Sequence, residues 1–178
     1  MGPRARPLGP YWRWEQNPQV LVGYGQQTPE SLQERTEGLG HQLRRTDNQA
    51  RFTVYDLAGG APTAVGTTAF QVDHRHRIAE YFILLGDAAS RGCGIGTEAT
   101  RLTLDYAFHI TNLACVHLTV LAPNVGAVRA YEKAGFRHVG LRRQSGYWLG
   151  ERVDEVIMDA IPADFPGPSA IKQQLGKQ

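Results

Sequence analysis

A glycine-rich segment between an apolar stretch and a helical one constrains the fold of this chain more than any other feature. Residues 91–96 read R-G-C-G-I-G, after the apolar run 81–85 and before residues 97–108, where apolar side chains recur at helical spacing. Glycines let a backbone approach a bulky anion closely, because no Cβ atom stands in the way. The first turn of a helix adds N–H groups without intrahelical partners and the positive end of the helix dipole. A strand, a glycine loop and a helix in this order predict a site for a phosphate or pyrophosphate group.

The flanking sequence predicts an α/β fold with a mixed sheet. Three strand-like stretches with short connections precede the loop, which is the pattern of an antiparallel meander. After the loop, a helix, a strand and a second helix follow, so we expect a βαβ crossover, with helices on both faces of the sheet. The predicted strands are residues 51–57, 64–72, 78–85, 116–121, 136–141 and 153–160, with 146–150 joining the last two, and the predicted helices after the loop are 97–110 and 124–134.

The length of the chain and its proline and glycine content predict one domain with two flanking segments. The chain has 178 residues, which suits a single domain. Residues 1–10 contain three prolines and two glycines, so we expect a loose N-terminal segment. Residues 11–161 form the domain, which opens with a short helix over 11–17 and a longer one over 28–45 that starts with Thr-Pro-Glu. The proline-rich residues 162–178 are expected to form a C-terminal surface tail.

Composition argues against several classes of protein. The net charge is only +2, and the densest basic cluster is one Arg-Arg pair, so no nucleic-acid partner is expected. No apolar run reaches the roughly 18 residues of a membrane-spanning helix, and the first ten residues lack the apolar core of a signal peptide. The two cysteines and six histidines show no metal-ligand spacing, so we expect no metal. A cytoplasmic protein fits these observations.

Two well-known phosphate-binding motifs fit the glycine loop poorly. Residues 94–99 match the G-x-G-x-x-A pattern of dinucleotide-binding folds. That fold expects an acidic residue about 20 positions later to bind the ribose, and residues 117–122 contain none. The loop also follows three predicted antiparallel strands, whereas it usually opens the dinucleotide fold. A Walker-type loop fails because no Gly-Lys-Ser/Thr follows the glycines.

A second motif identifies a better match. Residues 124–136 read N-V-G-A-V-R-A-Y-E-K-A-G-F, and together with R-G-C-G-I-G-T-E-A they closely resemble the GNAT superfamily of acetyl-CoA-dependent N-acetyltransferases. The resemblance runs from about residue 12 to 161 and is strongest over 79–158. Within the superfamily, the chain looks most like the branch of ribosomal-protein alanine acetyltransferases and spermidine acetyltransferases.

The resemblance implies where acetyl-CoA would bind. In that family the strand before the glycine loop parts from the next parallel strand, and the pantetheine arm pairs with the exposed strand edge. The glycine loop wraps the pyrophosphate with main-chain N–H groups, and an asparagine bonds the pantetheine arm. Carried over, the cofactor-binding residues are Ile83, Leu84, Leu85, Arg91, Gly92, Cys93, Gly94, Ile95, Gly96, Asn124 and Tyr131.

The same resemblance implies a direct transfer of the acetyl group to an amine in a ternary complex. Tyr131 lies two helical turns after Asn124, on the same helix face, and is the expected acid for the departing thiolate. Glu80 is the expected base, and a strand N–H near Leu84 would stabilise the oxyanion. Other roles stay open: Tyr131 also suits a core aromatic, Asn124 a helix N-cap, and Glu80 an exposed or paired strand acid.

The acceptor is expected to be a small-molecule primary amine or a protein N-terminus, and the protein itself is expected to form a homodimer. Aromatic residues that would shape its pocket are Trp12, Trp14, Tyr24 and Trp148, with Tyr147 beside them. Three departures from the family pattern affect this prediction. The family's first strand is absent or irregular, Tyr81-Phe82 replaces Ile-Gly, and Cys93 replaces the usual loop lysine. A CoA-binding module without catalytic activity is the alternative.

Overall fold

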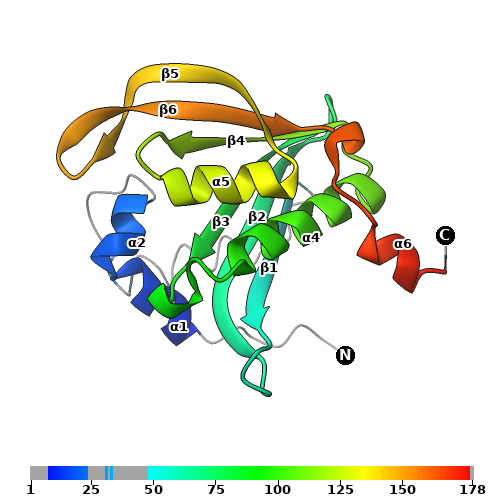
Figure 1. Ribbon diagram of the computed structural model, residues 1–178, viewed down its shortest axis with the longest axis horizontal. Helices are drawn as coiled ribbons and strands as arrows, with labels where there is room; N and C mark the ends of the chain where they lie inside the picture. Colours follow the sequence, from blue (N-terminus) through cyan, green and yellow to red (C-terminus); the bar gives the residue numbers. More distant parts are fainter. Residues whose placement is uncertain (1–7, 24–30, 32, 34–47, 177–178) are drawn as a thin grey trace.

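The computed structural model describes residues 8–23, 31, 33 and 48–176, which build one mixed sheet with helices on both of its faces (Figure 1). Six strands pair in the order β1-β2-β3-β4-β6-β5. Their bounds are β1 Gln49–Asp56, β2 Thr63–Asp73, β3 Ile78–Leu85, β4 Cys115–Leu121, β5 Arg137–Trp148 and β6 Glu151–Ala160.

The predicted meander and crossover are both confirmed. β1, β2 and β3 pair antiparallel in sequence order, and short turns connect them. β3 and β4 pair parallel, with helix α4 (Ile95–His109) as the connection between them. β6 then pairs antiparallel with both β4 and β5. The fold is therefore α/β with one parallel strand pair inside an otherwise antiparallel sheet.

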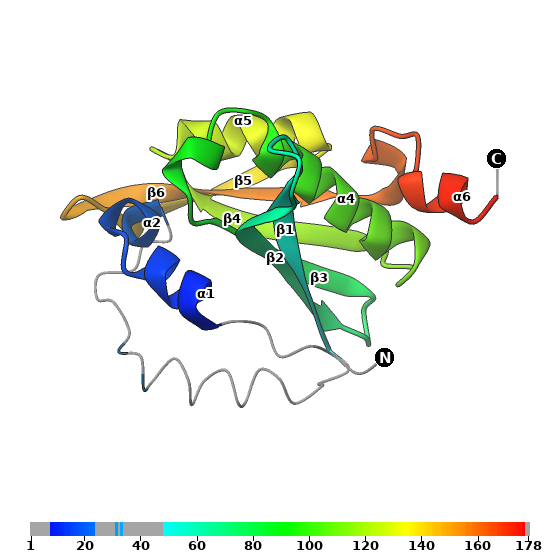
Figure 2. The ribbon, with the colours of Figure 1, turned by 90° about the horizontal axis from the view of Figure 1, so that it is seen from below.

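The hydrophobic core lies on the face of the sheet that α4 and α5 (Val125–Ala134) cover, as Figure 2 shows. Alternate residues of each strand point into it, because successive side chains of a strand face opposite sides of the sheet. On β3 these are Ala79 and Tyr81, and on β4 they are Val116 and Leu118, all buried. Helices α1 (Leu8–Glu15) and α2 (Pro18–Gly23) lie on the other face.

The N-terminal part of the described chain differs from the sequence prediction. α1 begins at Leu8, inside the segment expected to be loose, and a separate helix α2 begins at Pro18. Proline suits the first turn of a helix, where its missing N–H has no intrahelical partner anyway, so Pro18 starts α2 as well as ending α1. The predicted helix over 28–45 falls outside the described residues, apart from residues 31 and 33. Within the described part of the chain, no strand precedes β1.

The last hairpin is longer than predicted. β5 continues to Trp148 instead of ending at residue 141, and it pairs with β6 as far as Glu151. Leu149 and Gly150 form the turn with φ of 50° and 87°. Positive φ at both residues is what a two-residue hairpin turn of the right twist requires. The sequence prediction took residues 146–150 for a connection because their glycines suggested one, whereas Gly146 lies within the strand, where a side chain would strike Leu121.

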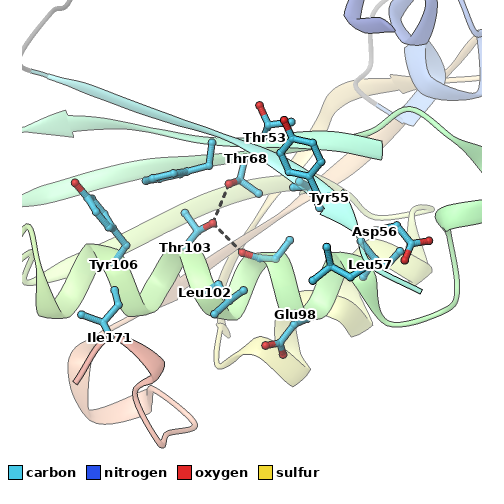
Figure 3. A pocket seen from close by; sticks show the side chains of 14 residues that line it. Thr53, Tyr55, Asp56, Leu57, Thr68, Glu98, Leu102, Thr103, Tyr106 and Ile171 are labelled. Atoms are coloured by element: carbon cyan, nitrogen blue, oxygen red, sulfur yellow. Dashed lines mark hydrogen bonds between the residues drawn. The ribbon is translucent and has the colours of Figure 1, made fainter. Parts of the chain in front are cut away.

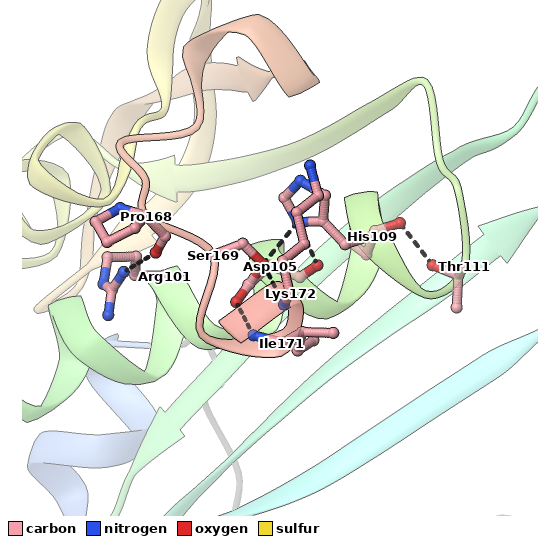
Figure 4. Close-up of polar contacts among 9 residues, drawn as sticks. Arg101, Asp105, His109, Thr111, Pro168, Ser169, Ile171 and Lys172 are labelled. Atoms are coloured by element: carbon pink, nitrogen blue, oxygen red, sulfur yellow. Dashed lines mark hydrogen bonds and ion pairs between the residues drawn. The ribbon is translucent and has the colours of Figure 1, made fainter. Parts of the chain in front are cut away.

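The C-terminal segment packs against α4 through a buried carboxylate (Figure 4). The segment contains a short 3-10 helix, η2 (Pro162–Asp164), and helix α6 (Ala170–Gln174). Asp105 of α4 accepts hydrogen bonds from the Ser169 hydroxyl at 2.6 Å and from the Ile171 N–H at 3.1 Å. The C-terminal segment is thus attached to α4 through Ser169 and Ile171. None of the helices in the described residues is long and apolar enough to cross a membrane.

Candidate functional site

The parallel strands β3 and β4 part soon after they begin to pair. Their register covers only Ile78–Cys115, Ala79–Val116 and Glu80–His117. Beyond that point β4 pairs with β6 on its other side, while β3 runs on to Leu85 and into the glycine loop. Figure 1 shows the two strands diverging toward the ends of α1 and α2. The sheet therefore has a V-shaped opening, and its apex lies at Glu80 and His117.

The glycine loop follows directly from the end of β3 and leads into α4. Gly92 and Gly94 have φ of 75° and 90°, and no atom lies within 4 Å of where their Cβ atoms would be. Gly94 is also the N-cap of α4, and no side chain caps that helix end. The loop thus presents bare main chain and an uncapped helix N-terminus to open space, which is the arrangement that the sequence predicted for a bound phosphate.

Arg91 and Cys93 have partners within the protein. The Arg91 guanidinium donates to the Leu85 carbonyl at 3.2 Å and to Gln19 Oε1 of α2 at 3.4 Å. It therefore ties the first residue of the loop to the end of β3 and to α2. Cys93 is exposed, and its thiol lies 3.1 Å from the Ser90 carbonyl.

Asn124 and Tyr131 lie on α5 at the other side of the opening. The Asn124 side chain caps the helix by accepting from the Ala127 N–H at 3.3 Å. Tyr131 packs edge-on against Tyr81 and Phe136, with ring centroids 6.3 and 5.9 Å apart. Burial raises the pKa of Tyr131, so its hydroxyl keeps its proton at neutral pH. The structural roles that the sequence left open for these two residues are thus present, since Asn124 caps α5 and Tyr131 packs beside the core.

Glu80 lies on the opposite face of the sheet from Tyr131. Glu80 alternates with Ala79 and Tyr81, which point into the core, and Tyr131 contacts Tyr81. The two predicted catalytic residues are therefore separated by the sheet itself, and Glu80 lies where the opening between β3 and β4 begins.

Glu80 belongs to a row of polar residues that crosses the whole sheet. Registered neighbours share a face of a sheet, and one row of registered pairs contains no apolar residue. From edge to edge it reads Gln49, Gln71, Glu80, His117, Asp159 and Arg137. Glu80, His117 and Asp159, the members on the three central strands, are half-buried. The sequence prediction missed His117, although its place in the alternating V-H-L-T-V strand puts it outside the core.

The predicted acceptor aromatics have different surroundings. Trp14 of α1 packs on Gly86, the residue after β3, where a Cβ atom would strike the indole ring. Trp12 is partly buried, and its indole N–H has no hydrogen-bond acceptor within the described residues. Trp148 pairs with Glu151 at the end of the last hairpin, while the guanidinium of Arg152 stacks 4.5 Å above the Tyr147 ring. Tyr24 lies outside the described residues.

A cavity of about 390 Å³ lies elsewhere, between the edge strand β1 and α4 (Figure 3). Its floor contains a hydrogen bond of 2.9 Å between the hydroxyls of Thr68 and Thr103. Of the predicted site residues, only Ile95 lines it. Within the part of the chain that the structure describes, no three His, Cys, Asp or Glu side chains cluster as metal ligands would.

Comparisons with known proteins point to one family. The family model described as an acetyltransferase (GNAT) domain matches residues 3–137, well over half of the chain. The chain is 42% identical over 81 residues to the probable N-acetyltransferase YjcK of Bacillus subtilis, and the match covers 43% of each protein. It is 27% identical over 124 residues to a spermidine N(1)-acetyltransferase of Vibrio cholerae, covering 70% of each.

Among solved structures, the fold is similar to that of a spermidine N-acetyltransferase from Vibrio cholerae in complex with CoA and spermine. The TM-score is 0.78 over 92% of this chain and 96% of that one, at 23% identity. At that identity the likeness shows the fold, and the matching stretch spans less than half the length of the Bacillus subtilis relative. Membership of a family rests on the domain match, on the glycine loop that follows β3, and on the strand opening beside it. On these observations, the chain belongs to the acetyltransferase (GNAT) family.

Proposed function

We propose that the protein is an N-acetyltransferase that moves the acetyl group of acetyl-CoA to a primary amine in a ternary complex. The observation that carries the proposal is the opening between β3 and β4, followed at once by a bare glycine loop at a helix N-terminus. An extended chain fits beside a strand that has parted from its neighbour, and a pyrophosphate fits the loop. Pantetheine joined to a pyrophosphate has this shape.

Acetyl-CoA would be held along one continuous path of main chain. Residues 83–85 at the end of β3 would pair with the pantetheine amides. Gly92 and Gly94 would leave room for the pyrophosphate, and Gly96 would continue the loop where a Cβ atom would be 3.2 Å from Leu85. Cys93 and Ile95 would contribute their N–H groups. Arg91 would hold the loop in place and add a positive charge, and Asn124 would contact the pantetheine arm from α5.

Tyr131 and Glu80 would act on the two reacting ends. The Tyr131 phenol is protonated at neutral pH and can donate a proton to the departing sulfur. Glu80 lies at the apex of the opening on the other face, where an amine would approach. Its carboxylate attracts an ammonium ion and is placed to take part in its deprotonation.

A small-molecule amine is the acceptor that the surroundings favour over a protein N-terminus. The Vibrio cholerae relatives are named for spermidine. In this chain, Glu80 and Asp159 lie on the sheet face opposite Tyr131, where the amine would approach. Phe82, the next residue of β3 on that face, is 41% exposed. An amine with an aliphatic chain would match this mixture of carboxylates and apolar surface. We also propose a cytoplasmic location. We further propose that the protein is a homodimer, and light scattering should then give about twice the 19.7 kDa chain mass.

The decisive experiment separates binding from transfer. Calorimetry with CoA and acetyl-CoA at neutral pH is expected to give saturable binding, and at 100 times Kd the ligand should add about 2.7 kcal/mol to the free energy of unfolding. The protein is then incubated with acetyl-CoA and a panel of polyamines, antibiotic amines and peptides, and products are identified by mass spectrometry. Absence of any binding of CoA compounds contradicts the proposal. Binding without transfer to any amine supports the non-catalytic alternative.

A further inference from the structure

The last registered pair before β3 and β4 separate places two ionisable side chains next to each other. Glu80 and His117 are the final partners of the parallel register, so both lie at the apex of the opening and on the same face. That face is the one away from Tyr131 and the core. A group that reaches the apex from that face would meet these two residues.

The described residues show no structural role for either side chain. Within residues 48–176, the structure contains no hydrogen bond or ion pair of the Glu80 or His117 side chain. Both are half-buried in a sheet face, where polar groups lose part of their hydration. A carboxylate and an imidazole held side by side without mutual contact are suited to receive a third, cationic group.

Asp159 completes the group on the far side of His117. It is the registered partner of His117 on β6. Burial and the negative charge of Asp159 raise the pKa of the Cys115 thiol on β4. The charge of Asp159 therefore acts on neighbouring groups of β4. Arg137, the next member of the row, pairs with Asp164. His117 thus has a carboxylate on each neighbouring strand, Glu80 on β3 and Asp159 on β6.

We propose that His117 is a further catalytic residue, which accepts the proton that the amine loses, while Glu80 holds the amine as it arrives. This inference rests on the proposed N-acetyltransferase activity and refines the part of Glu80 in it. An imidazole is the side chain that exchanges protons most readily near neutral pH, so it is a better proton acceptor for an amine than a carboxylate alone.

The proton and bond changes balance as follows. The ammonium ion bound at Glu80 gives one proton to His117, which passes it to solvent. The neutral nitrogen forms a bond to the acetyl carbonyl carbon, the carbon–sulfur bond breaks, and sulfur takes the Tyr131 phenolic proton. The second N–H proton leaves as the amide forms and, through solvent, replaces the one that Tyr131 gave up. One proton ends on sulfur and one in solvent.

The test compares His117→Asn with the wild-type protein on the best amine from the panel. Asparagine keeps a polar side chain of similar reach but does not accept a proton near neutral pH. We expect kcat to fall about 10²-fold, the Kd for acetyl-CoA to stay within twofold, and the acidic limb of the kcat pH profile to disappear. His138→Asn on β5, which removes an exposed contact with Glu132, is the matched control and should keep its kcat and pH profile.

Two further measurements separate a chemical role from a structural one. Added imidazole should restore part of the kcat of His117→Ala in a saturable way and should leave His138→Ala unaffected. Glu80→Gln combined with His117→Asn should lose little more than the worse single variant, because groups that act as a unit are not additive. A kcat for His117→Asn within twofold of wild type overturns the inference and leaves the proposed function intact. A wild-type protein that transfers acetyl to no amine overturns both.

Discussion

At the scale of single residues, Tyr131 occupies a position that serves two purposes. Its ring packs against Tyr81 and Phe136 beside the core, and its buried hydroxyl stays protonated. If Tyr131 only packed there, its replacement by phenylalanine would leave the turnover of the enzyme unchanged. The hydroxyl itself is therefore what a substitution must test.

Tyr131→Phe is expected to lower turnover about 10²- to 10⁴-fold and to change the Kd for acetyl-CoA little, because only proton donation is removed. Steady-state kinetics and calorimetry measure the two quantities. Tyr81→Phe is the control, since it removes a neighbouring buried hydroxyl that bonds to Thr100 at 2.9 Å. An unchanged turnover for Tyr131→Phe would remove Tyr131 from the mechanism.

Asn124 also combines two roles, and these can be separated by substitution. Asn124→Ala should lower the free energy of unfolding by about 1 kcal/mol, because the α5 N-cap is lost. Asn124→Asp keeps the capping oxygen and should preserve stability, yet it loses the amide donor and is expected to weaken acetyl-CoA binding. Denaturant unfolding and calorimetry on both variants provide the measurement. Equal acetyl-CoA affinity in Asn124→Asp and wild type would leave Asn124 as a cap alone.

At the scale of elements, α1 and α2 contact both sides of the strand opening. Trp14 of α1 packs on Gly86 at the end of β3, and Gln19 of α2 meets Arg91 of the loop. Gly23 at the end of α2 lies close to Asn124, where a Cβ atom would be 3.8 Å from its amide nitrogen. The two helices thus help to fix the width of the opening at its wide end.

Gly86→Ala should therefore destabilise the fold by about 1–3 kcal/mol, the usual cost of overpacking a close contact. The added methyl group strikes the Trp14 indole, so Trp14→Ala in the same chain should recover part of the loss. A double-mutant cycle of unfolding free energies measures the coupling. Strictly additive effects would mean that the two residues do not contact each other in solution.

The attachment of α6 to α4 gives a prediction with a defined pH dependence. Desolvation of the Asp105 carboxyl opposes its charge, but hydrogen bonds from Ser169, Ile171 and His109 outweigh that effect and lower its pKa. A lowered pKa means that the folded state favours the ionised form. The stabilisation is therefore complete above the ordinary aspartate pKa near 3.9 and is lost as the pH falls below it.

Asp105→Asn should lower the free energy of unfolding at pH 7 by about 1–3 kcal/mol, because Asp105 is only 1% exposed and its charged hydrogen bonds are lost. The difference from wild type should shrink as the pH is lowered from about 4 to 2. Urea unfolding at a series of pH values measures it. A difference that stays constant over that range would contradict a role for the Asp105 charge.

The sequence predicted the elements whose signals are local and missed those set by contacts. β3 covers residues 78–85, as predicted, and Asn124 caps α5 as its residue type suggests. The length of β5 was not predictable, since Gly146 looks like a turn residue until Leu121 is seen filling the space beside it. His117 was missed for a similar reason, because only the strand register places it beside Glu80.

At the scale of the whole molecule, the sheet consists of two halves with few hydrogen bonds between them. β1, β2 and β3 form one half, and β4, β6 and β5 form the other. Three registered residue pairs link the halves, whereas β2 and β3 share eight. Helices on both faces supply the rest of the connection.

Binding of acetyl-CoA between the halves is expected to protect the molecule unevenly. Amide hydrogen exchange should slow at the end of β3, in the glycine loop and in the first turn of α4, because these groups would contact the ligand. β1 and the β5–β6 turn lie away from it and should be little changed. Exchange followed by mass spectrometry, with and without ligand, measures this pattern, and uniform protection of all strands would contradict it.

The short parallel register also sets a limit on how far the fold can be stabilised. Substitutions that let β3 and β4 continue to pair beyond Glu80 and His117 would add interstrand hydrogen bonds and raise the thermal unfolding temperature. The same change would close the opening between β3 and β4 in which the thioester is proposed to bind. Selection for heat resistance would then favour a longer pairing of β3 with β4, whereas selection for turnover would favour the short one.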